Sequence, residues 1–325
     1  MVGSHLLLQL AKNNTSIRAL KRNTSDMSVF NHVFSGDIDS VKNIEWVDGD
    51  ITDIFCLEEL LQNATQVYHC AAMISFAPHE AIKMLHTNMD GTANIVNTCL
   101  KLNVQKLCYA SSVASLGRNT AETAISEETH WEPSYDNSNY AISKYGAERE
   151  VWRGISEGLN AVMVNPSIIL GAGNWNNGSG KIFQQVWNGL RFYTKGATGF
   201  VDVRDVANIM IELMNSNISG ERFLLNAENR SYKDFFISVA KLLNKKPPIF
   251  YATPFISGLA WRVEAIREII SNNKPLITKE TARTAHKKYL YSNEKIKKAL
   301  GYEFIPLNET LKFVCEEFLT EKNIR

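Results

Sequence analysis

The chain has 325 residues, a length that suits one large α/β domain or two packed lobes and leaves ample chain to bury a core. Its 35 Lys and Arg residues nearly balance its 34 Asp and Glu residues, and the two signs are interspersed along the sequence. Because no basic field is available to hold a polyanion, nucleic acid is excluded as an expected partner.

The cysteines and the hydropathy of the sequence further limit the class of protein. The five cysteines are an odd number, and no spacing among them is typical of zinc ligands, so we expect reduced core thiols and no metal site. No apolar run approaches the ~18 residues that span a bilayer, and the N-terminus lacks the pattern of a signal peptide. These features favour a cytoplasmic protein that does not enter a membrane. The cysteines are Cys56, Cys70, Cys99, Cys108 and Cys315.

From its start to about residue 170, the chain alternates short β-type runs with amphipathic helical stretches. This alternation is typical of a parallel sheet that helices cover on both faces. We predict an α/β fold, with a Rossmann-like, doubly wound dinucleotide-binding domain over residues 1–170. The predicted strands are Ser16–Leu20, Ile44–Val47, Gln66–Cys70, Lys106–Ala110 and Ala161–Asn165, and the predicted helices are Ile54–Leu61, Glu80–Leu102 and Asn139–Glu157.

The pattern becomes irregular after Gly171, where a Gly/Asn-rich loop precedes short helical stretches and several prolines. We predict a smaller, mainly helical substrate lobe over residues 171–325, from which residues 199–225 return to the sheet. Aromatic side chains of this lobe offer surface for a substrate, although such residues more often belong to a core. They are Trp175, Phe183, Trp187 and Tyr193.

The beginning of the chain departs from the order of a dinucleotide-binding unit. That order is strand, Gly-rich turn, helix and strand, with the pyrophosphate at the N-terminus of the first helix. Here a helical segment comes first, and Gly3 stands where the last glycine of the turn would contact the cofactor. We expect that the first strand and two glycines lie outside this chain. The alternative is a fold that never had this strand, which would leave two neighbouring strands with unpaired backbone groups.

Tyr140 and Lys144 lie four residues apart on a predicted helix, so both side chains leave the same face. An ammonium beside the phenol would lower its pKa from ~10, and the effect is large only in a partly dry cleft. The spacing alone is weak evidence, since Tyr291 and Lys295 repeat it. We interpret that second pair as part of a solvated helix face in the helical lobe.

The sequence that precedes Tyr140 supports the first pair. An apolar strand runs into Ser111 and Ser112 and then into Gly117. In open α/β sheets, ligands bind outside the carboxyl ends of the strands, so we expect these hydroxyls and the Tyr140 helix to line one crevice. The alternative is that the serines only begin a loop by hydrogen bonding to the backbone.

Seven short motifs follow one another along most of the chain. They are Gly49 to Asp53, His69 to Ala72, Asn88 to Thr92, Ser111-Ser112, Tyr140 to Lys144, Asn165 to Gly171 and Phe200 to Ala207. Together and in this order they resemble the extended short-chain dehydrogenase/reductase family, of the NAD-dependent epimerase/dehydratase type. The runs Asn165 to Gly171 and Ile17 to Arg22 are most similar to dihydroflavonol and cinnamoyl-CoA reductases. We expect the motif that begins at Phe200 to attach the second lobe to the sheet.

The resemblance implies roles for individual residues. Tyr140 would be the general acid/base, Lys144 would lower its pKa and bind the nicotinamide ribose, and Ser112 would hydrogen bond to the substrate oxygen. Asn88 matches a position that supports a proton relay in related enzymes, or it is a packing and hydrogen-bonding residue inside its helix. Further cofactor contacts are implied for Asp50, Ile51, Ala71, Ala72, Pro166 and Ser167, although close packing alone would also explain the two alanines.

The end of the strand predicted at Ser16–Leu20 bears on the choice of cofactor. It carries Lys21 and Arg22 and no carboxylate that would accept a hydrogen bond from a ribose 2′-hydroxyl. Both side chains could pair with a 2′-phosphate, and Arg22 could also stack on adenine. We therefore predict NADP as the cofactor, with NAD as the alternative, because exposed basic residues are also common on solvated surfaces.

Three functions remain open at this point. The first is reduction of a ketone or aldehyde in a small-molecule substrate, and the second is epimerisation of a nucleotide sugar with a retained cofactor. The third is a non-catalytic or inactive chain whose cofactor affinity is weakened by the missing turn. Relatives also commonly form homodimers through the two long helices that correspond here to Glu80–Leu102 and Asn139–Glu157.

Overall fold

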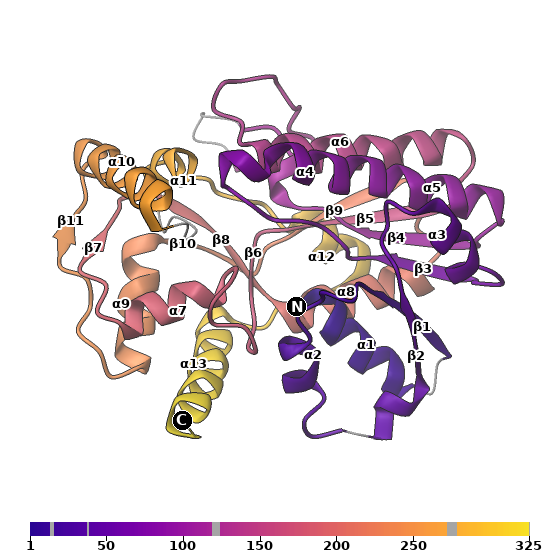
Figure 1. Ribbon diagram of the computed structural model, residues 1–325, viewed down its shortest axis with the longest axis horizontal. Helices are drawn as coiled ribbons and strands as arrows, with labels where there is room; N and C mark the ends of the chain where they lie inside the picture. The colour runs from indigo at the N-terminus through magenta and orange to yellow at the C-terminus, as the bar shows by residue number, and fades with distance from the viewer. Residues whose placement is uncertain (14–15, 38, 119–123, 272–277, 325) are drawn as a thin grey trace.

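A computed structural model describes residues 1–13, 16–37, 39–118, 124–271 and 278–324 (Figure 1). The elements up to the end of the fifth strand are α1 Val2–Lys12, β1 Ile17–Lys21, α2 Ser28–Val33, β2 Ile44–Asp48, α3 Ile54–Leu60, β3 Gln66–His69, α4 Ala81–Leu85, α5 Gly91–Lys101, β4 Lys106–Ala110, α6 Asn139–Ser156 and β5 Ala161–Pro166. The later elements are β6 Ile168–Leu170, α7 Gly180–Trp187, β7 Phe192–Tyr193, β8 Ala197–Asp202, α8 Val203–Asn215, β9 Glu221–Leu225, β10 Glu228–Ser231, α9 Tyr232–Leu242, β11 Phe250–Tyr251, α10 Pro254–Ser271, α11 Lys279–Thr284, α12 Glu294–Leu300 and α13 Leu307–Ile324.

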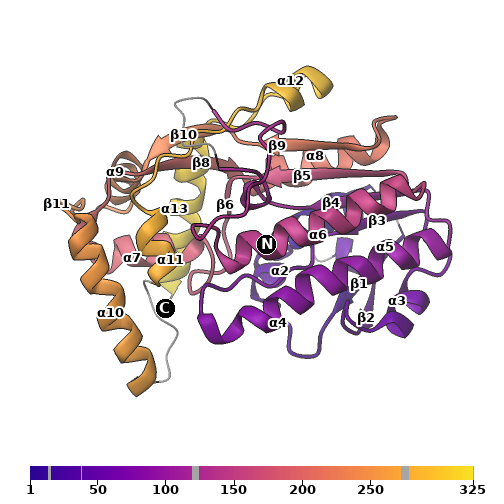
Figure 2. The ribbon, with the colours of Figure 1, turned by 90° about the horizontal axis from the view of Figure 1, so that it is seen from above.

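The main sheet consists of four parallel strands in the order β3-β4-β5-β9. Helices α3, α5 and α6 pack on one face, and α1, α8 and α12 pack on the other (Figures 1 and 2). The chain is therefore an α/β protein with a doubly wound, Rossmann-like arrangement. No helix among the described residues combines the length and the apolar character needed to cross a membrane.

Strand β4 illustrates why a sheet covered on both faces reads as a continuous apolar run rather than as an alternation. Leu107 and Tyr109 pack with the α5 and α6 side, whereas Cys108 packs with the α1 and α8 side, and all three are buried. Successive side chains leave a strand on opposite faces, so each face receives half of the strand. Small polar side chains follow directly after the carboxyl end of β4, at Ser111 and Ser112.

The second lobe has its own core, built from α7, α9, α13 and the three-stranded sheet β10-β8-β6. Trp175 and Phe183 are buried in this core and Trp187 packs against it, which confirms the core interpretation for these aromatic residues. The motif that begins at Phe200 attaches this lobe as expected. The Asp205 carboxylate accepts hydrogen bonds from the Tyr302 hydroxyl at 3.0 Å and from the amide of Ile305 at 3.1 Å.

Strands β1 and β2 form a two-stranded parallel sheet apart from the main sheet, and within the described residues β1 does not pair with β3. Two features differ from the sequence-based expectations. Of residues 199–225, only β9 joins the main sheet, because β8 pairs with β6 and β10 instead. The long helix expected over Glu80–Leu102 is interrupted at His86–Asp90 by a π-helical turn that separates α4 from α5. Single π-turns inside helices are frequent at functional sites.

Candidate active site

Two hydroxyl groups meet at the carboxyl end of β4. Ser112 begins a single 3₁₀ turn, and its Oγ accepts a hydrogen bond from the amide of Ala114 at 3.1 Å. Tyr140 is the second residue of α6, whose first turn is fixed by the N-cap Ser138. The Ser112 side chain lies close enough to Tyr140 to lower its pKa, against the effect of burial. The structure therefore brings these two predicted residues together, and the Ser112 side chain also hydrogen bonds to its local backbone.

Lys144 is buried one helical turn below Tyr140. Its Nζ donates hydrogen bonds to the hydroxyl of Tyr109 at 2.8 Å and to the carbonyl oxygen of Ala110 at 2.9 Å. Burial lowers the pKa of Lys144 to about 8, although the nearby carboxylate of Glu148 opposes this change. Burial thus destabilises the charged form of Lys144. Strand β4, rather than Tyr140, orients its ammonium group.

Burial raises the pKa of Tyr140 above its usual value, and the nearby Ser112 side chain acts in the opposite direction. The lowering of this pKa that the Tyr140–Lys144 spacing predicts is therefore not found, and the Lys144 ammonium is hydrogen-bonded to Tyr109 and Ala110 instead. The phenol is protonated at neutral pH, which is the form that a proton donor requires, but its raised pKa also makes it a weaker acid.

Asn88 lies in the π-turn and is buried. Both the oxygen and the nitrogen of its side-chain amide form hydrogen bonds. Its Oδ1 accepts from the amide of Met73 at 2.7 Å, and its Nδ2 donates to the Met73 carbonyl oxygen and to the Ser143 hydroxyl, both at 2.9 Å. These contacts fasten the loop after β3 to α6. They match the hydrogen-bonding alternative for Asn88, and the relay role stays a prediction.

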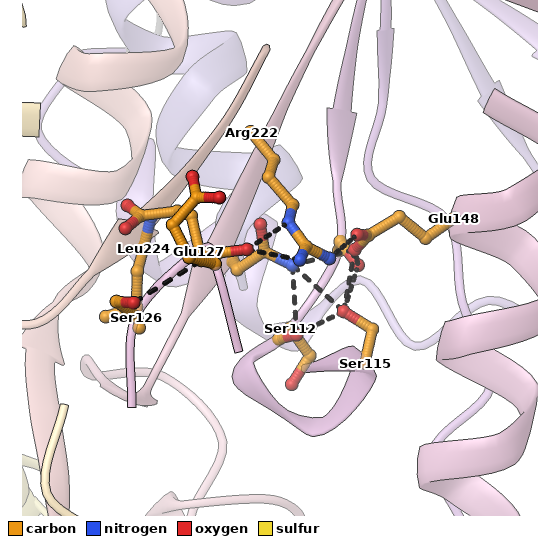
Figure 3. A network of polar contacts seen from close by, with 10 residues as sticks. Ser112, Ser115, Ser126, Glu127, Glu148, Arg222 and Leu224 are labelled. Carbon is orange, nitrogen blue, oxygen red and sulfur yellow. Dashed lines mark hydrogen bonds and ion pairs between the residues drawn. The ribbon is translucent and has the colours of Figure 1, made fainter. Parts of the chain in front are cut away.

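A buried polar network lies behind Ser112 (Figure 3). The carboxylate of Glu148 accepts hydrogen bonds from the hydroxyls of Ser111 and Ser115, both at 2.6 Å, and from Asn165 Nδ2 at 2.7 Å. Its other oxygen forms an ion pair with Arg222 on β9 at 2.7 Å. Because Asn165 also donates to the carbonyl oxygen of Ser112, at 3.2 Å, the network fixes the backbone that carries the Ser112 hydroxyl.

Several residues expected to contact a dinucleotide lie at the carboxyl edge of the main sheet. Ala71 and Ala72 are exposed in the loop after β3, and a side chain at Gly3 would meet only Cys70, at 3.9 Å. Pro166 ends β5, and the buried Oγ of Ser167 has no hydrogen-bond partner. An unpaired buried hydroxyl beside an open loop fits a polar ligand such as a nicotinamide cofactor.

The residues expected near the adenine end of the cofactor differ from one another in their burial and in their partners. Lys21 forms an ion pair with Asp48 on β2, whereas Arg22 is exposed and close enough to Asp50 to help lower its pKa, against the effect of burial. Asp50 Oδ1 accepts hydrogen bonds from the amide and hydroxyl of Thr52. The side chain of Ile51 is buried in the core and lies against Gly91.

A pocket of about 180 Å³ opens beside Tyr140. Its wall combines Val113 and Ala114, next to Ser112, with residues from distant parts of the chain. A larger cavity of about 680 Å³ shares Arg118 and Tyr289 with this pocket but does not include Tyr140. Within the described residues, no group of three His, Cys, Asp or Glu side chains is placed to hold a metal ion. The residues that line the smaller pocket, beside Tyr140, are Phe76, Val113, Ala114, Gly117, Arg118, Ile125, Ser138, Tyr140, Glu280, Thr284, Tyr289 and Tyr291.

Sequence reasoning missed much of this lining and misplaced Tyr291. That residue was expected on a solvated helix face with Lys295, but it precedes α12, bridges to Ile125 and lines the pocket. Lys295 instead forms an ion pair with Glu221. Some of the missed residues precede Tyr140, from Phe76 to Ser138, whereas Glu280 and Thr284 of α11 follow it by more than 130 positions. No local pattern could assign the α11 residues, because only the packing of the second lobe on α6 brings them near.

Residues 1–226 match the model of the NAD dependent epimerase/dehydratase family. Sterol demethylase protein B of Methylococcus capsulatus is 25% identical over 232 residues, which cover 70% of this chain and 67% of that protein. A Synechocystis protein provisionally named dihydroflavonol 4-reductase is 27% identical over 264 residues (76% and 71%). Cinnamoyl-CoA reductase 1 of Petunia hybrida is 24% identical over 274 residues (81% and 73%). The resemblance drawn from the motifs is therefore confirmed.

Solved structures agree with this assignment. The crystal structure of gox2253 superposes with a TM-score of 0.81 at 27% identity and covers 99% of this chain and 96% of that one. The complex of UDP-glucose 4-epimerase from Thermus thermophilus with NAD superposes with a TM-score of 0.75 at 18% identity, covering 98% and 96%, a likeness that shows the fold alone. Given the family match over most of its length, this chain belongs to the NAD dependent epimerase/dehydratase family.

Proposed function

We propose that this protein reduces the carbonyl group of a small molecule, with Tyr140 as proton donor and Ser112 as hydrogen-bond donor to the same oxygen. The observation that carries this proposal is the pair of hydroxyl groups of Tyr140 and Ser112, which lie near each other at the carboxyl end of β4 beside a pocket of about 180 Å³. A carbonyl oxygen placed between them would contact both hydroxyls.

The chemistry divides between the cofactor and the chain. A bound nicotinamide supplies the hydride that adds to the carbonyl carbon. Tyr140, whose phenol is protonated at neutral pH, gives its proton to the oxygen. Ser112 stabilises the negative charge that develops on the same oxygen. Lys144, buried one turn away and hydrogen-bonded to Tyr109, contributes a positive charge to the same water-poor region.

The cofactor would be held by Gly3, Ala71, Ala72 and the hydroxyl of Ser167, with Lys144 toward the nicotinamide ribose. We propose NADP rather than NAD, with Arg22 as the main contact to a 2′-phosphate. Lys21 contributes less to this proposal than the sequence suggested, because Asp48 already neutralises it.

Steady-state kinetics with Tyr140→Phe test this function. The purified chain is mixed with NADPH and a panel of ketones and aldehydes, and oxidation of NADPH is followed by absorbance together with product formation. We expect substrate-dependent consumption, lowered at least ~100-fold in Tyr140→Phe. Tyr145→Phe is the matched control on the same helix, since Tyr145 stacks on Trp131, away from the pocket.

Other outcomes separate the alternatives. Isomerisation of a nucleotide sugar without net consumption of NADPH would replace the reductase by an epimerase. A chain that binds neither NADPH nor NADH in calorimetry would instead be a non-catalytic protein. Equal turnover by wild type and Tyr140→Phe would contradict the assigned proton donor.

We also propose a homodimer through the helices at residues 80–102 and 139–157. Ile82 on α4 is 83% exposed and Ile142 on α6 is 41% exposed, an apolar pair on the segments expected to form this interface. Sedimentation of wild type and Ile82→Glu decides the matter, with a dimer expected only for the wild type.

A further inference from the structure

Two buried polar atoms without a hydrogen-bond partner belong to the lining of the pocket beside Tyr140. They are Oε2 of Glu280 and the hydroxyl oxygen of Tyr289. Buried polar atoms of folded proteins nearly always have a partner, because an unpaired one has lost its bonds to water without replacement. Two such atoms in one small pocket point to a ligand that supplies the partners.

The Glu280 carboxylate is placed by the helix that carries Tyr140. Its Oε1 accepts a hydrogen bond of 3.4 Å from the amide of Asn139, the first residue of α6. One oxygen thus contacts the helix start, and Oε2 is left without a partner. Burial raises the pKa of Glu280, while the Asn139 amide and the charges of Arg118 and Arg283 oppose this rise.

The rest of the pocket restricts the kind of ligand. Phe76, Val113 and Ile125 offer apolar surface, and the volume of about 180 Å³ is close to the ~150 Å³ cavity that accepts a benzene ring. Arg118 is the cation of this lining, and its guanidinium already donates to the carbonyl oxygen of Asp136 and lies over the ring of Tyr289. The pocket therefore suits a compact, largely apolar molecule without a negative charge.

We infer that Glu280 determines substrate choice by accepting a hydrogen bond from a hydroxyl group of the carbonyl compound and by rejecting compounds with a carboxylate at that position. This inference rests on the proposed carbonyl reduction, since it places the carbonyl oxygen at Tyr140 and Ser112. It adds a specificity-determining residue from α11 to that site.

The test compares ratios of kcat/KM. The probes are benzaldehyde, its ortho, meta and para hydroxy derivatives, and the corresponding carboxybenzaldehydes, each with NADPH. Wild type should prefer the best hydroxybenzaldehyde over benzaldehyde about tenfold. Glu280→Leu, which has no acceptor, should bring this ratio close to one. Glu280→Gln, which is neutral and can donate, should raise the ratio of carboxybenzaldehyde to benzaldehyde about tenfold. Glu128→Gln is the control, because Glu128 is exposed and lines only the larger cavity.

Ratios separate recognition from a structural effect, because a damaged α6 would slow all the probes together. Unchanged ratios in both Glu280 variants would overturn the inference while leaving the reductase function intact. If wild type reduces none of the probes, the proposed function fails for this compound class, and calorimetry then decides on Glu280. Tighter binding of a hydroxybenzaldehyde to wild type than to Glu280→Leu would support its role, and equal binding would refute it.

Discussion

The ammonium of Lys144 donates a hydrogen bond of 2.8 Å to the hydroxyl of Tyr109, and it also lies 4.5 Å from the centre of the Tyr109 ring. Tyr109 stacks on His69 from the neighbouring strand, with ring centroids 5.0 Å apart. Strand β4 therefore sets the position of the Lys144 charge, and β3 supports it through the stacking of His69 on Tyr109. Tyr140 does not set this position. This arrangement makes Tyr109 a positioning residue for the proposed site.

Tyr109→Phe should lower kcat about tenfold and destabilise the fold by about 1.5–3 kcal/mol, because it removes a buried hydrogen bond to a charged group. Titration of kcat against pH checks the positioning role, since a misplaced ammonium should shift the alkaline limb of the profile. Tyr68→Phe is the matched control, as Tyr68 lies on β3 but packs on the opposite face of the sheet. A Tyr109→Phe variant with a wild-type pH profile and kcat would argue against this role.

Stability should depend on pH through Lys144. Its folded pKa of about 8 lies below the value of 10.5 for a free lysine, so between these values the unfolded chain binds more protons than the folded one. The free energy of unfolding should therefore rise with pH across this window, by up to ~3 kcal/mol, while the full penalty of the buried charge is present below pH 8.

Urea denaturation of wild type and Lys144→Met from about pH 7 to about pH 10 measures this contribution as the difference between the two curves. Lys101→Met serves as the control, because Lys101 is exposed and pairs with Glu58 at the surface. Parallel curves for wild type and Lys144→Met would show that Lys144 keeps an ordinary pKa.

Glu148→Gln should be strongly destabilising, by about 3–5 kcal/mol, because it leaves the guanidinium of Arg222 without its buried partner. Glu150→Gln, in an ion pair with Arg153 on the solvated side of the same helix, should cost less than ~1 kcal/mol. Urea denaturation compares the two, and the double variant Glu148→Gln/Arg222→Gln should recover part of the loss. If both single variants lose the same small amount, the network is not a major source of stability.

Arg22→Ala should weaken NADPH binding about tenfold and leave the affinity for NADH nearly unchanged, since a phosphate contact is lost and no ribose contact is. Calorimetry with each cofactor measures both constants. Lys12→Ala, at the far end of α1, controls for the loss of a surface charge. Equal losses for NADPH and NADH would place Arg22 against the part that the two cofactors share, and tighter binding of NADH by wild type would reverse the choice of cofactor.

Much of the fold followed from sequence because local patterns and sheet burial are short-range properties. The apolar runs at Lys106–Ala110 and Ala161–Asn165 became β4 and β5 to within one residue, and the amphipathic stretch at Asn139–Glu157 became α6. The spacing of Tyr140 and Lys144 on that helix likewise fixed their common face. What β8 pairs with could not be read in the same way, because an apolar strand is compatible with either sheet and only the packing of the second lobe selects β6 and β10.

The sequence by itself determined the family, the layered α/β architecture and the identity of the hydroxyl pair, since each depends on residues close together in the chain. Only the tertiary structure decided which groups surround that pair. It assigned the Lys144 ammonium to Tyr109, committed the Asn88 amide to a loop and brought Glu280 against the start of α6. These contacts join residues that are 15 to 141 positions apart, and their energies depend on burial and geometry that no local pattern encodes.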